Sequence, residues 1–163
     1  MPALLTRAAL VAVGALIVAG AARAETVAVV VVPPFPLEQY AGRGAVGLMP
    51  GGAGTTVTRE GALAALVRGK VEKSLLGGVP GGRPLITLAR RPAATTIYVS
   101  LPPPGRHVGN RRYPVAIVGS GFAGTLDSTS TRIPGLVSIA DIAPTALGRG
   151  VNSASDLRSP MAP

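Results

Sequence analysis

The sequence contains no cysteine, no tryptophan and few aromatic residues of any kind (3%). The absence of cysteine excludes disulfide bonds and thiolate metal sites. With so few rings, a hydrophobic core must be built from Val, Leu, Ile and Ala, which favours buried parallel strands over an aromatic-rich sandwich. At 163 residues, of which 47% are hydrophobic, the chain is long enough for one domain with its own core and too short for two ordinary domains.

Acidic residues are also scarce: there are seven Asp and Glu against sixteen Lys and Arg, and the formal net charge is +9. Most of the basic residues are Arg, scattered singly or in pairs such as Arg90-Arg91. This excess is compatible either with binding to anionic polymers or with a simple compositional bias toward Arg. No basic helix with interleaved aromatic residues is present, so we expect no nucleic-acid partner. The single histidine, His107, has no acidic neighbour in the sequence and is expected to be a solvated loop residue.

The first 24 residues have the three parts of a secretory signal peptide. Arg7 supplies a positive charge, residues 8–22 form an unbroken apolar run, and Ala22-Arg23-Ala24 is an A-x-A cleavage signal. The run is shorter than the ~20 residues that span a bilayer comfortably. We therefore expect export to the cell envelope or the extracellular space, with an uncleaved N-terminal membrane anchor as the alternative.

Short β-branched runs separated by helical or loop stretches predict an α/β fold with a mainly parallel sheet, flanking helices and many loops. The best strand candidates are residues 26–32, 95–101 and 113–118, and a weaker candidate covers 85–88. Residues 59–74 carry apolar side chains at near-helical spacing and predict a helix that ends at Gly77-Gly78. Residues 36–54 are expected to be a loop. The last segment, 149–163, has no periodicity and is predicted to be a disordered tail.

Two glycine-rich stretches are similar to nucleotide- or phosphate-binding loops. Residues 119–124 read GSGFAG, a literal G-x-G-x-x-G directly after a predicted strand. The dinucleotide fingerprint needs a helix that opens at these glycines, but residues 125–135 are a poor helix, so we expect a tight turn and no nicotinamide or flavin cofactor. Residues 51–56 read GGAGTT and lack the Lys of a phosphate loop. They are expected to form a turn, with a weaker phosphate nest as the alternative.

Residues 113–147 read YPVAIVGSGFAGTLDSTSTRIPGLVSIADIAPTAL. They contain, in order, a strand, a glycine turn, an STR-x-PG stretch and a D-I-A-P-T helix start that Asp141 can cap. In this order they resemble the C-terminal core of the alkaline-phosphatase superfamily, and most closely its exported or membrane-associated actinobacterial members. The predicted strand at 26–32 is similar to the first strand of that superfamily. The resemblance implies an alkaline-phosphatase-like core over residues 25–148 and, because intact domains of the superfamily are larger, a partial domain.

The same resemblance implies what an active member would need. Active members hold two metal ions with Asp and His ligands around a Ser or Thr nucleophile. Where their metal-binding Asp follows the first strand, this chain has Pro33-Pro34, and it has Ser and Thr at 128–131 where a His would stand. Two metal ions need about six protein ligands, so nearly all of the seven carboxylates and the one His would have to converge. We therefore expect a degenerate, non-catalytic domain without a cofactor.

These observations lead to one favoured function and three alternatives. The favoured one is a binding or scaffolding role in the cell envelope, with envelope components or membrane proteins as partners. The first alternative is a residual hydrolase of phosphate or sulfate esters, in which Thr55 or Thr56 is the nucleophile, Asp141 lies near the site and a divalent metal such as Zn²⁺ is required. The second is an exported basic protein that binds anionic polymers, and the third is a fragment without a function.

Overall fold

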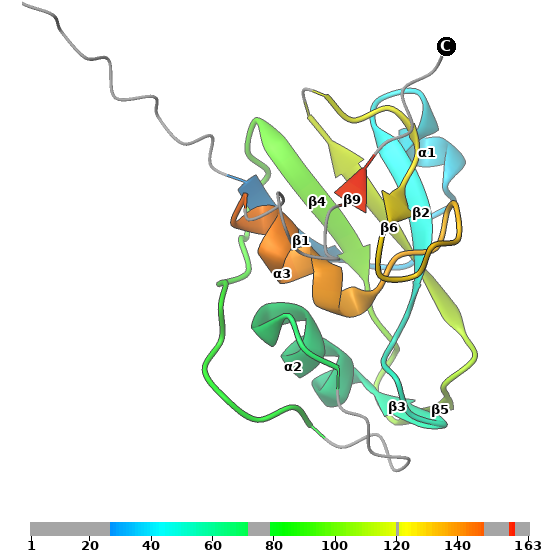
Figure 1. Ribbon diagram of the computed structural model, residues 1–163, viewed down its shortest axis with the longest axis vertical. Helices are drawn as coiled ribbons and strands as arrows, with labels where there is room; N and C mark the ends of the chain where they lie inside the picture. The colour runs from blue at the N-terminus through cyan, green and yellow to red at the C-terminus, as the bar shows by residue number, and fades with distance from the viewer. Residues whose placement is uncertain (1–26, 72–78, 120, 149–156, 159–163) are drawn as a thin grey trace, which may run out of the picture.

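The predicted strands form the centre of the molecule. The computed structural model describes residues 27–71, 79–119, 121–148 and 157–158. Five strands form one sheet in the spatial order β1 (Val27–Val32), β4 (Thr95–Ser100), β6 (Arg112–Val118), β2 (Ala45–Pro50) and β7 (Gly124–Thr125) (Figure 1). Two small ladders lie outside this sheet: β3 (Thr56–Thr58) with β5 (Arg106–Val108), and β8 (Asp127–Ser128) with β9 (Leu157–Arg158). The helices are α1 (Glu38–Ala41), α2 (Arg59–Arg68) and α3 (Ile142–Ala146), the last preceded by the 3₁₀ turn η1 (Ile139–Asp141).

The sheet is mixed, so the predicted α/β fold is confirmed but a mainly parallel sheet is not. The pairs β1–β4 and β2–β7 are parallel, whereas β4–β6 and β6–β2 are antiparallel. The connection from β4 to β6 covers only residues 101–111. A crossover to a parallel strand needs a dozen or more residues and usually a helix. The chain therefore has to return antiparallel at this point.

One face of the sheet carries the hydrophobic core. Val29, Ile97, Ile117 and Ala45 stand in register across four neighbouring strands on this face, and all are buried. The helices cover them with buried side chains from α2 (Ala62, Ala65, Leu66), η1 (Ile139) and α3 (Ile142). Full burial of each Leu, Ile or Val side chain stabilises the fold by about 1.5–3 kcal/mol. The core thus fixes α2 and α3 on one side of the sheet.

The opposite face is covered by a small aromatic group. Tyr98 of β4 alternates with Ile97 and therefore points away from the core. Tyr40 of α1 stacks on Tyr98 with ring centroids 4.7 Å apart, and Phe35 meets Tyr40 edge to face at 4.9 Å. These three rings account for most of the few aromatic residues in the chain.

The helix α2 begins where the sequence predicts and ends earlier. Thr58 is its N-cap, because the Gly61 N–H donates to Thr58 Oγ1 at 3.0 Å. Its C-cap is Gly69, which adopts the left-handed conformation (φ 61°) that glycine reaches without strain. The predicted stop at Gly77-Gly78 lies outside the described residues.

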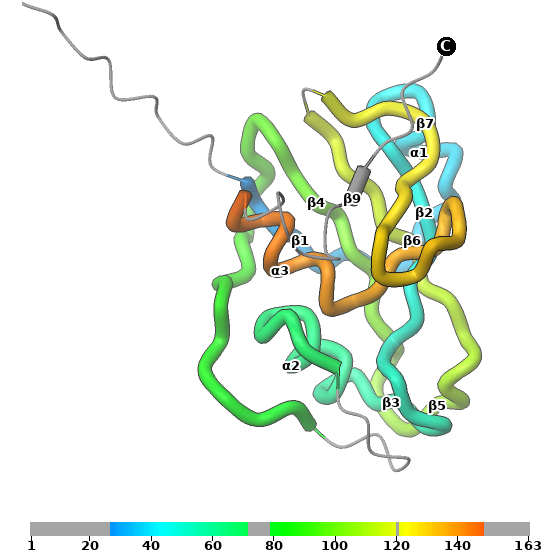
Figure 2. Tube along the Cα trace, in the orientation of Figure 1, coloured from blue at the N-terminus to red at the C-terminus, as the bar shows by residue number. Residues whose placement is uncertain are grey.

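Two sequence predictions are wrong for the described residues. Residues 36–54 are not a loop, because they contain α1 and β2. Residues 85–88 form no strand. Instead, the Leu85 N–H donates to the Val67 carbonyl at 2.7 Å and the Ala89 N–H donates to the Val29 carbonyl at 2.8 Å. The green segment in Figure 2 therefore runs from α2 to the outer edge of β1 and covers that edge without pairing along it.

The chain ends are described only in part. The predicted signal peptide, residues 1–24, lies outside the described residues, as does most of the predicted tail. Within that tail, Leu157–Arg158 forms β9 against β8, and disorder of the tail stays a prediction. In the described part of the chain, no helix is both long and apolar enough to cross a membrane. The GSGFAG motif leads from β6 into the short strand β7 and not into a helix, which agrees with a glycine turn.

Candidate functional site

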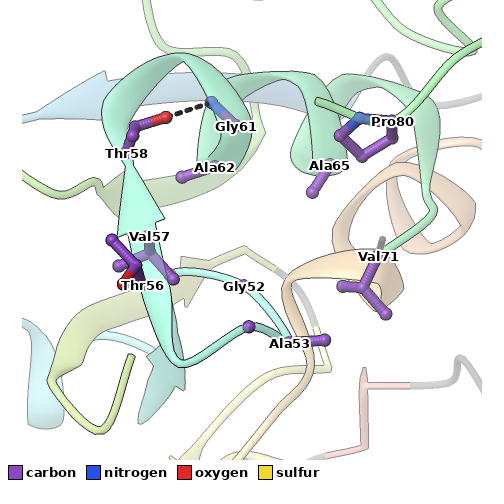
Figure 3. A pocket seen from close by; sticks show the side chains of 12 residues that line it. Gly52, Ala53, Thr56, Val57, Thr58, Gly61, Ala62, Ala65, Val71 and Pro80 are labelled. Atoms are coloured by element: carbon purple, nitrogen blue, oxygen red, sulfur yellow. Dashed lines mark hydrogen bonds between the residues drawn. The ribbon is translucent and has the colours of Figure 1, made fainter. Parts of the chain in front are cut away.

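The glycine loop at residues 51–54 joins β2 to β3 beside the first turn of α2 (Figure 3). Together with β3, α2, Val71 and Pro80, this loop lines a slot of about 20 Å³. A cavity needs roughly 10–15 Å³ to hold one water molecule. In this conformation the slot has room for a water molecule and none for a phosphate ester.

The threonines that follow this loop have different surroundings. Thr55 is exposed, and its carbonyl accepts a hydrogen bond from the Gly109 N–H at 2.8 Å. Thr56 is half-buried, lines the slot and pairs with Val108 of β5. The hydroxyl that lies at the N-terminus of α2 belongs to Thr58 and is engaged as the helix cap. The structure therefore gives Thr58 a structural role, and a nucleophilic role for Thr55 or Thr56 stays a prediction.

His107 lies in strand β5, opposite Val57, and not in the loop that the sequence predicts. Its Nε2 is 3.0 Å from the Pro103 carbonyl and 3.2 Å from the Pro104 carbonyl. Because carbonyl oxygens only accept, Nε2 must carry the proton and donate. The ring therefore holds the proline-rich connection after β4 in place.

Asp141 is the centre of a buried polar network and is only 3% exposed. Its Oδ2 accepts hydrogen bonds from Ser128 Oγ at 2.5 Å, Ser130 Oγ at 2.6 Å and the Ser138 N–H at 3.1 Å. Ser138 is the N-cap of η1, and the Asp141 carboxylate completes its capping box. Asp141 also occupies the N-cap position of α3, as the sequence predicts, but its side chain makes no capping hydrogen bond to that helix. Ser128 and Ser130 are thus hydrogen-bond partners of this carboxylate.

The predicted site residues are attached to different ends of α2. Thr55 and Thr56 precede α2, whereas the segment beside Asp141 packs at the other end of the helix. There, a Cβ added to Gly69 would lie 3.4 Å from the Ala140 carbonyl and 3.1 Å from Pro144 Cδ. The helix between these ends has ten residues, and at 1.5 Å per residue it spans about 15 Å. A site that Thr55 or Thr56 shares with Asp141 stays a prediction.

A larger recess, of about 330 Å³, lies where β1 and β4 end. Val32 pairs with Ser100, so the two parallel strands end at the same edge of the sheet. Proline has no N–H to continue a ladder. The segments that follow β1 and β4 therefore leave the sheet at this edge. The Ser100 hydroxyl donates to the Pro33 carbonyl at 2.9 Å and ties the two ends together. The recess is lined by Val31, Val32, Pro33, Pro34, Arg59, Leu101, Pro103 and Pro104.

Arg59 is the only charged residue in this lining. It is the first residue of α2, and its Nη1 donates to the Pro102 carbonyl at 3.1 Å. This bond holds the guanidinium at the wall of the recess. No sequence pattern singled out this recess, because prolines after a strand predict only the end of that strand. The signal that could have found it is the pair of proline-rich stretches that follow two strong strands, since the carboxyl ends of parallel neighbours meet at one edge.

Tyr113 of β6 lies beside the same region. Its hydroxyl is buried and has no hydrogen-bond partner among the described residues. Burial raises the pKa of Tyr113, and the positive charge of Arg111 opposes part of this shift. Gly51 separates the ring from the proline stretch: a Cβ at Gly51 would lie 3.1 Å from Tyr113 Cε2 and 2.8 Å from Pro102 Cγ. Only glycine fits between them without displacement.

Carboxylates and the histidine are spread over the molecule. Glu38 lies on α1, Glu60 on α2, Asp127 on β8 and Asp141 in η1. Within the described ranges, no three His, Asp or Glu side chains gather closely enough to hold a metal ion.

Comparison with protein-family models, with curated proteins and with solved structures gave no match to this chain.

Proposed function

We propose that this chain is an exported, degenerate alkaline-phosphatase-like domain that binds a ligand in the cell envelope without hydrolysing it. The observation that supports this most is the lining of the recess at the ends of β1 and β4. In the superfamily that residues 113–147 resemble, a metal-binding Asp follows the first strand. Here Pro33-Pro34 follow it, and the recess is lined by Val, Leu and Pro with one guanidinium. Apolar walls with a single polar group favour an organic ligand, whereas metal ions need clustered carboxylates or imidazoles.

The position of the recess supports the same function. Open α/β sheets bind their ligands outside the carboxyl ends of parallel strands, and β1 and β4 are such a pair. Residues 113–147 contain all of β6 except its first residue, and also β7, β8, η1 and α3. Of these, β6 lies next to β4 in the sheet and α3 lies near β1. An alkaline-phosphatase-like core and a location in the envelope are parts of this proposal.

A thermal melt with and without excess Zn²⁺ separates binding from metal-dependent hydrolysis. A ligand that binds only the folded state adds about 2.7 kcal/mol of stability at 100 times its Kd. We expect the same melting midpoint with and without zinc, and no release of 4-nitrophenol from its phosphate or sulfate ester above the buffer rate. A zinc-dependent rise in the midpoint, together with turnover that Thr55→Ala or Thr56→Ala abolishes, would replace this proposal by the hydrolase.

Two further outcomes of the same experiment count against the proposal. Tight binding to polyphosphate that falls steeply with added salt would support the basic protein that binds anionic polymers. The absence of any cooperative melt would support a fragment without a function, since a single domain of this size should unfold cooperatively.

A further inference from the structure

We propose that the recess at the ends of β1 and β4 binds an organic ligand with one singly charged oxyanion group, which Arg59 holds, and an apolar body, which lies against the prolines. This inference rests on the proposed binding role and names the class of ligand. A carboxylate, a sulfate ester and a phosphodiester share this chemistry. The inference follows from the partners of Arg59, the number of charges in the recess and the nature of its walls.

The guanidinium of Arg59 is held in place by one hydrogen bond, but most of its N–H donors have no hydrogen-bond partner among the described residues. A guanidinium has five N–H donors, and the bond from Nη1 to the Pro102 carbonyl uses one of them. The other donors of Arg59 have no partner among the described residues, and no carboxylate in that part of the chain forms an ion pair with it. A half-buried cation without a counterion attracts an anion. A planar oxyanion suits it best, because two parallel N–H groups can each donate to one of its oxygens.

The recess sets the charge of the ligand at one. Arg59 is the only ionisable residue in the lining, so a phosphomonoester with two negative charges would bury one of them without compensation. The single histidine does not change this count. His107 is not part of the lining, and its Nε2 donates to the carbonyls of Pro103 and Pro104. A monoanion matches the single guanidinium.

The walls set the nature of the rest of the ligand. Seven of the eight lining residues are Val, Leu or Pro. A volume of about 330 Å³ falls at the lower end of the range for small-molecule sites, which is about 300–1,000 Å³. Proline side chains have little conformational freedom, so these walls lose little entropy when a ligand is bound. A compact hydrocarbon or aromatic body fits this surface better than a sugar or a free inorganic ion.

The test compares a charged probe with its neutral isostere on the purified full chain. Calorimetric titration measures the Kd of 4-phenylbutyrate and of 4-phenylbutyramide, which differ only in the carboxylate. The same titrations are made on Arg59→Gln and on a control, Arg90→Gln, whose Arg is exposed and outside the recess. Titrations with 4-nitrophenyl sulfate, short-chain phosphatidylglycerol and inorganic phosphate identify which source of the oxyanion is preferred.

We expect the unmodified chain and Arg90→Gln to bind phenylbutyrate at least tenfold more tightly than the amide. In Arg59→Gln this preference should disappear while the affinity for the amide changes less than twofold, which also shows that the variant has folded. Equal affinity for acid and amide in the unmodified chain would overturn the inference without any variant. So would an equal loss in Arg59→Gln and Arg90→Gln, or tighter binding of inorganic phosphate than of every organic probe.

Failure of this inference is distinguishable from failure of the proposed function. If zinc leaves the melt unchanged and no probe depends on Arg59, the ligand class is wrong while a binding or scaffolding role elsewhere on the chain remains. If zinc raises the midpoint and 4-nitrophenyl esters are hydrolysed, the proposed function itself is wrong, whatever the affinity for phenylbutyrate.

Discussion

Polar groups are fully hydrogen-bonded in the network around Asp141, whereas in the recess at the ends of β1 and β4 they are not. In the network, one carboxylate oxygen receives three donors between 2.5 and 3.1 Å. In the recess, the guanidinium of Arg59 has a single carbonyl partner, and the buried hydroxyl of nearby Tyr113 has none among the described residues. The carboxylate of Asp141 and the Ser hydroxyls, which are candidates for chemistry in the sequence, therefore use their hydrogen-bonding capacity on one another. The groups with unused hydrogen-bonding capacity lie among residues that look like strand breaks, and these are the better guide to a site.

The largest expected effect on stability comes from removing the carboxylate of Asp141 from its hydrogen-bond network. Asp141→Ala should lower the free energy of unfolding by about 3 kcal/mol, because three donors lose their acceptor in a buried place. Urea denaturation measures this loss. Glu60→Ala, which removes an exposed carboxylate, is the control and should change stability by less than about 0.5 kcal/mol. A loss below about 1 kcal/mol for Asp141→Ala would show that the network is not structural.

A smaller loss is expected from crowding the boundary of the recess. Gly51→Ala places a Cβ 2.8 Å from Pro102 Cγ and should destabilise the protein by about 2 kcal/mol through overpacking. Because the Pro102 carbonyl holds Arg59, ligand affinity in the recess should fall as well. Gly42→Ala is the matched control, since a Cβ there meets nothing within 4 Å. Equal stability of the two variants in urea would mean that the Gly51 contact relaxes freely.

Thr56 and Thr58, which follow the glycine loop, should differ in how much each contributes to stability, because only the Thr58 side chain caps a helix. Thr58→Ala removes the cap of α2 and should cost about 1 kcal/mol, whereas Thr56→Ala should change stability by less than about 0.5 kcal/mol. Thermal melts of both variants measure this difference. A larger loss for Thr56→Ala than for Thr58→Ala would contradict the assignment of Thr58 as the cap.

The smallest effect, and one of opposite sign, is expected at the unsatisfied hydroxyl. Tyr113→Phe removes a buried group without a partner and should raise the free energy of unfolding by up to about 1 kcal/mol near neutral pH. The raised pKa of Tyr113 means that the folded state holds the proton more tightly than the unfolded state. The stability that the fold gains from keeping Tyr113 protonated, relative to an ionised Tyr113, is complete below the unfolded pKa of about 10. It is lost as pH rises toward the folded pKa.

Urea denaturation of both proteins at neutral pH and above pH 10 checks this prediction. The unmodified protein should lose stability over that interval, and Tyr113→Phe should lose less. A clear destabilisation by Tyr113→Phe at neutral pH would show that the hydroxyl has a partner after all.

The parts of the fold that local patterns predict are the buried ones. β1 is a continuous apolar run, and β4 and β6 are rich in β-branched and aromatic residues. Such runs are typical of strands that are covered on both faces, so they can be predicted from the sequence. β2 was missed for a reason that lies in its packing. A Cβ at Gly47 would lie 3.1 Å from the Gly135 carbonyl and 3.2 Å from Leu126 Cβ, so close packing requires a glycine that weakens the strand pattern.

The candidate site could not be predicted from local sequence patterns. The recess exists because Val32 and Ser100 are paired, although 68 residues separate them. No window of the sequence contains both of the proline-rich stretches that follow them. The carboxylate of Asp141 was visible as a candidate, but its partners Ser128, Ser130 and Ser138 are set by the turn geometry around it.

The strand order also has a consequence for how the protein comes to be folded. Among the described strands of the five-stranded sheet, β4 and β6 pair across a short connection, whereas the pairs β1–β4, β2–β6 and β2–β7 join segments far apart along the chain. Such non-local pairing slows folding, because the entropy of closing long loops must be lost before the contacts form. At a synthesis rate of about 5–20 residues per second, the run VAVVVV of β1 waits several seconds for β4, its partner. A short, uncharged, β-branched segment left unpaired for that time is prone to aggregate, so the nascent chain should depend on a chaperone more than its size alone would indicate.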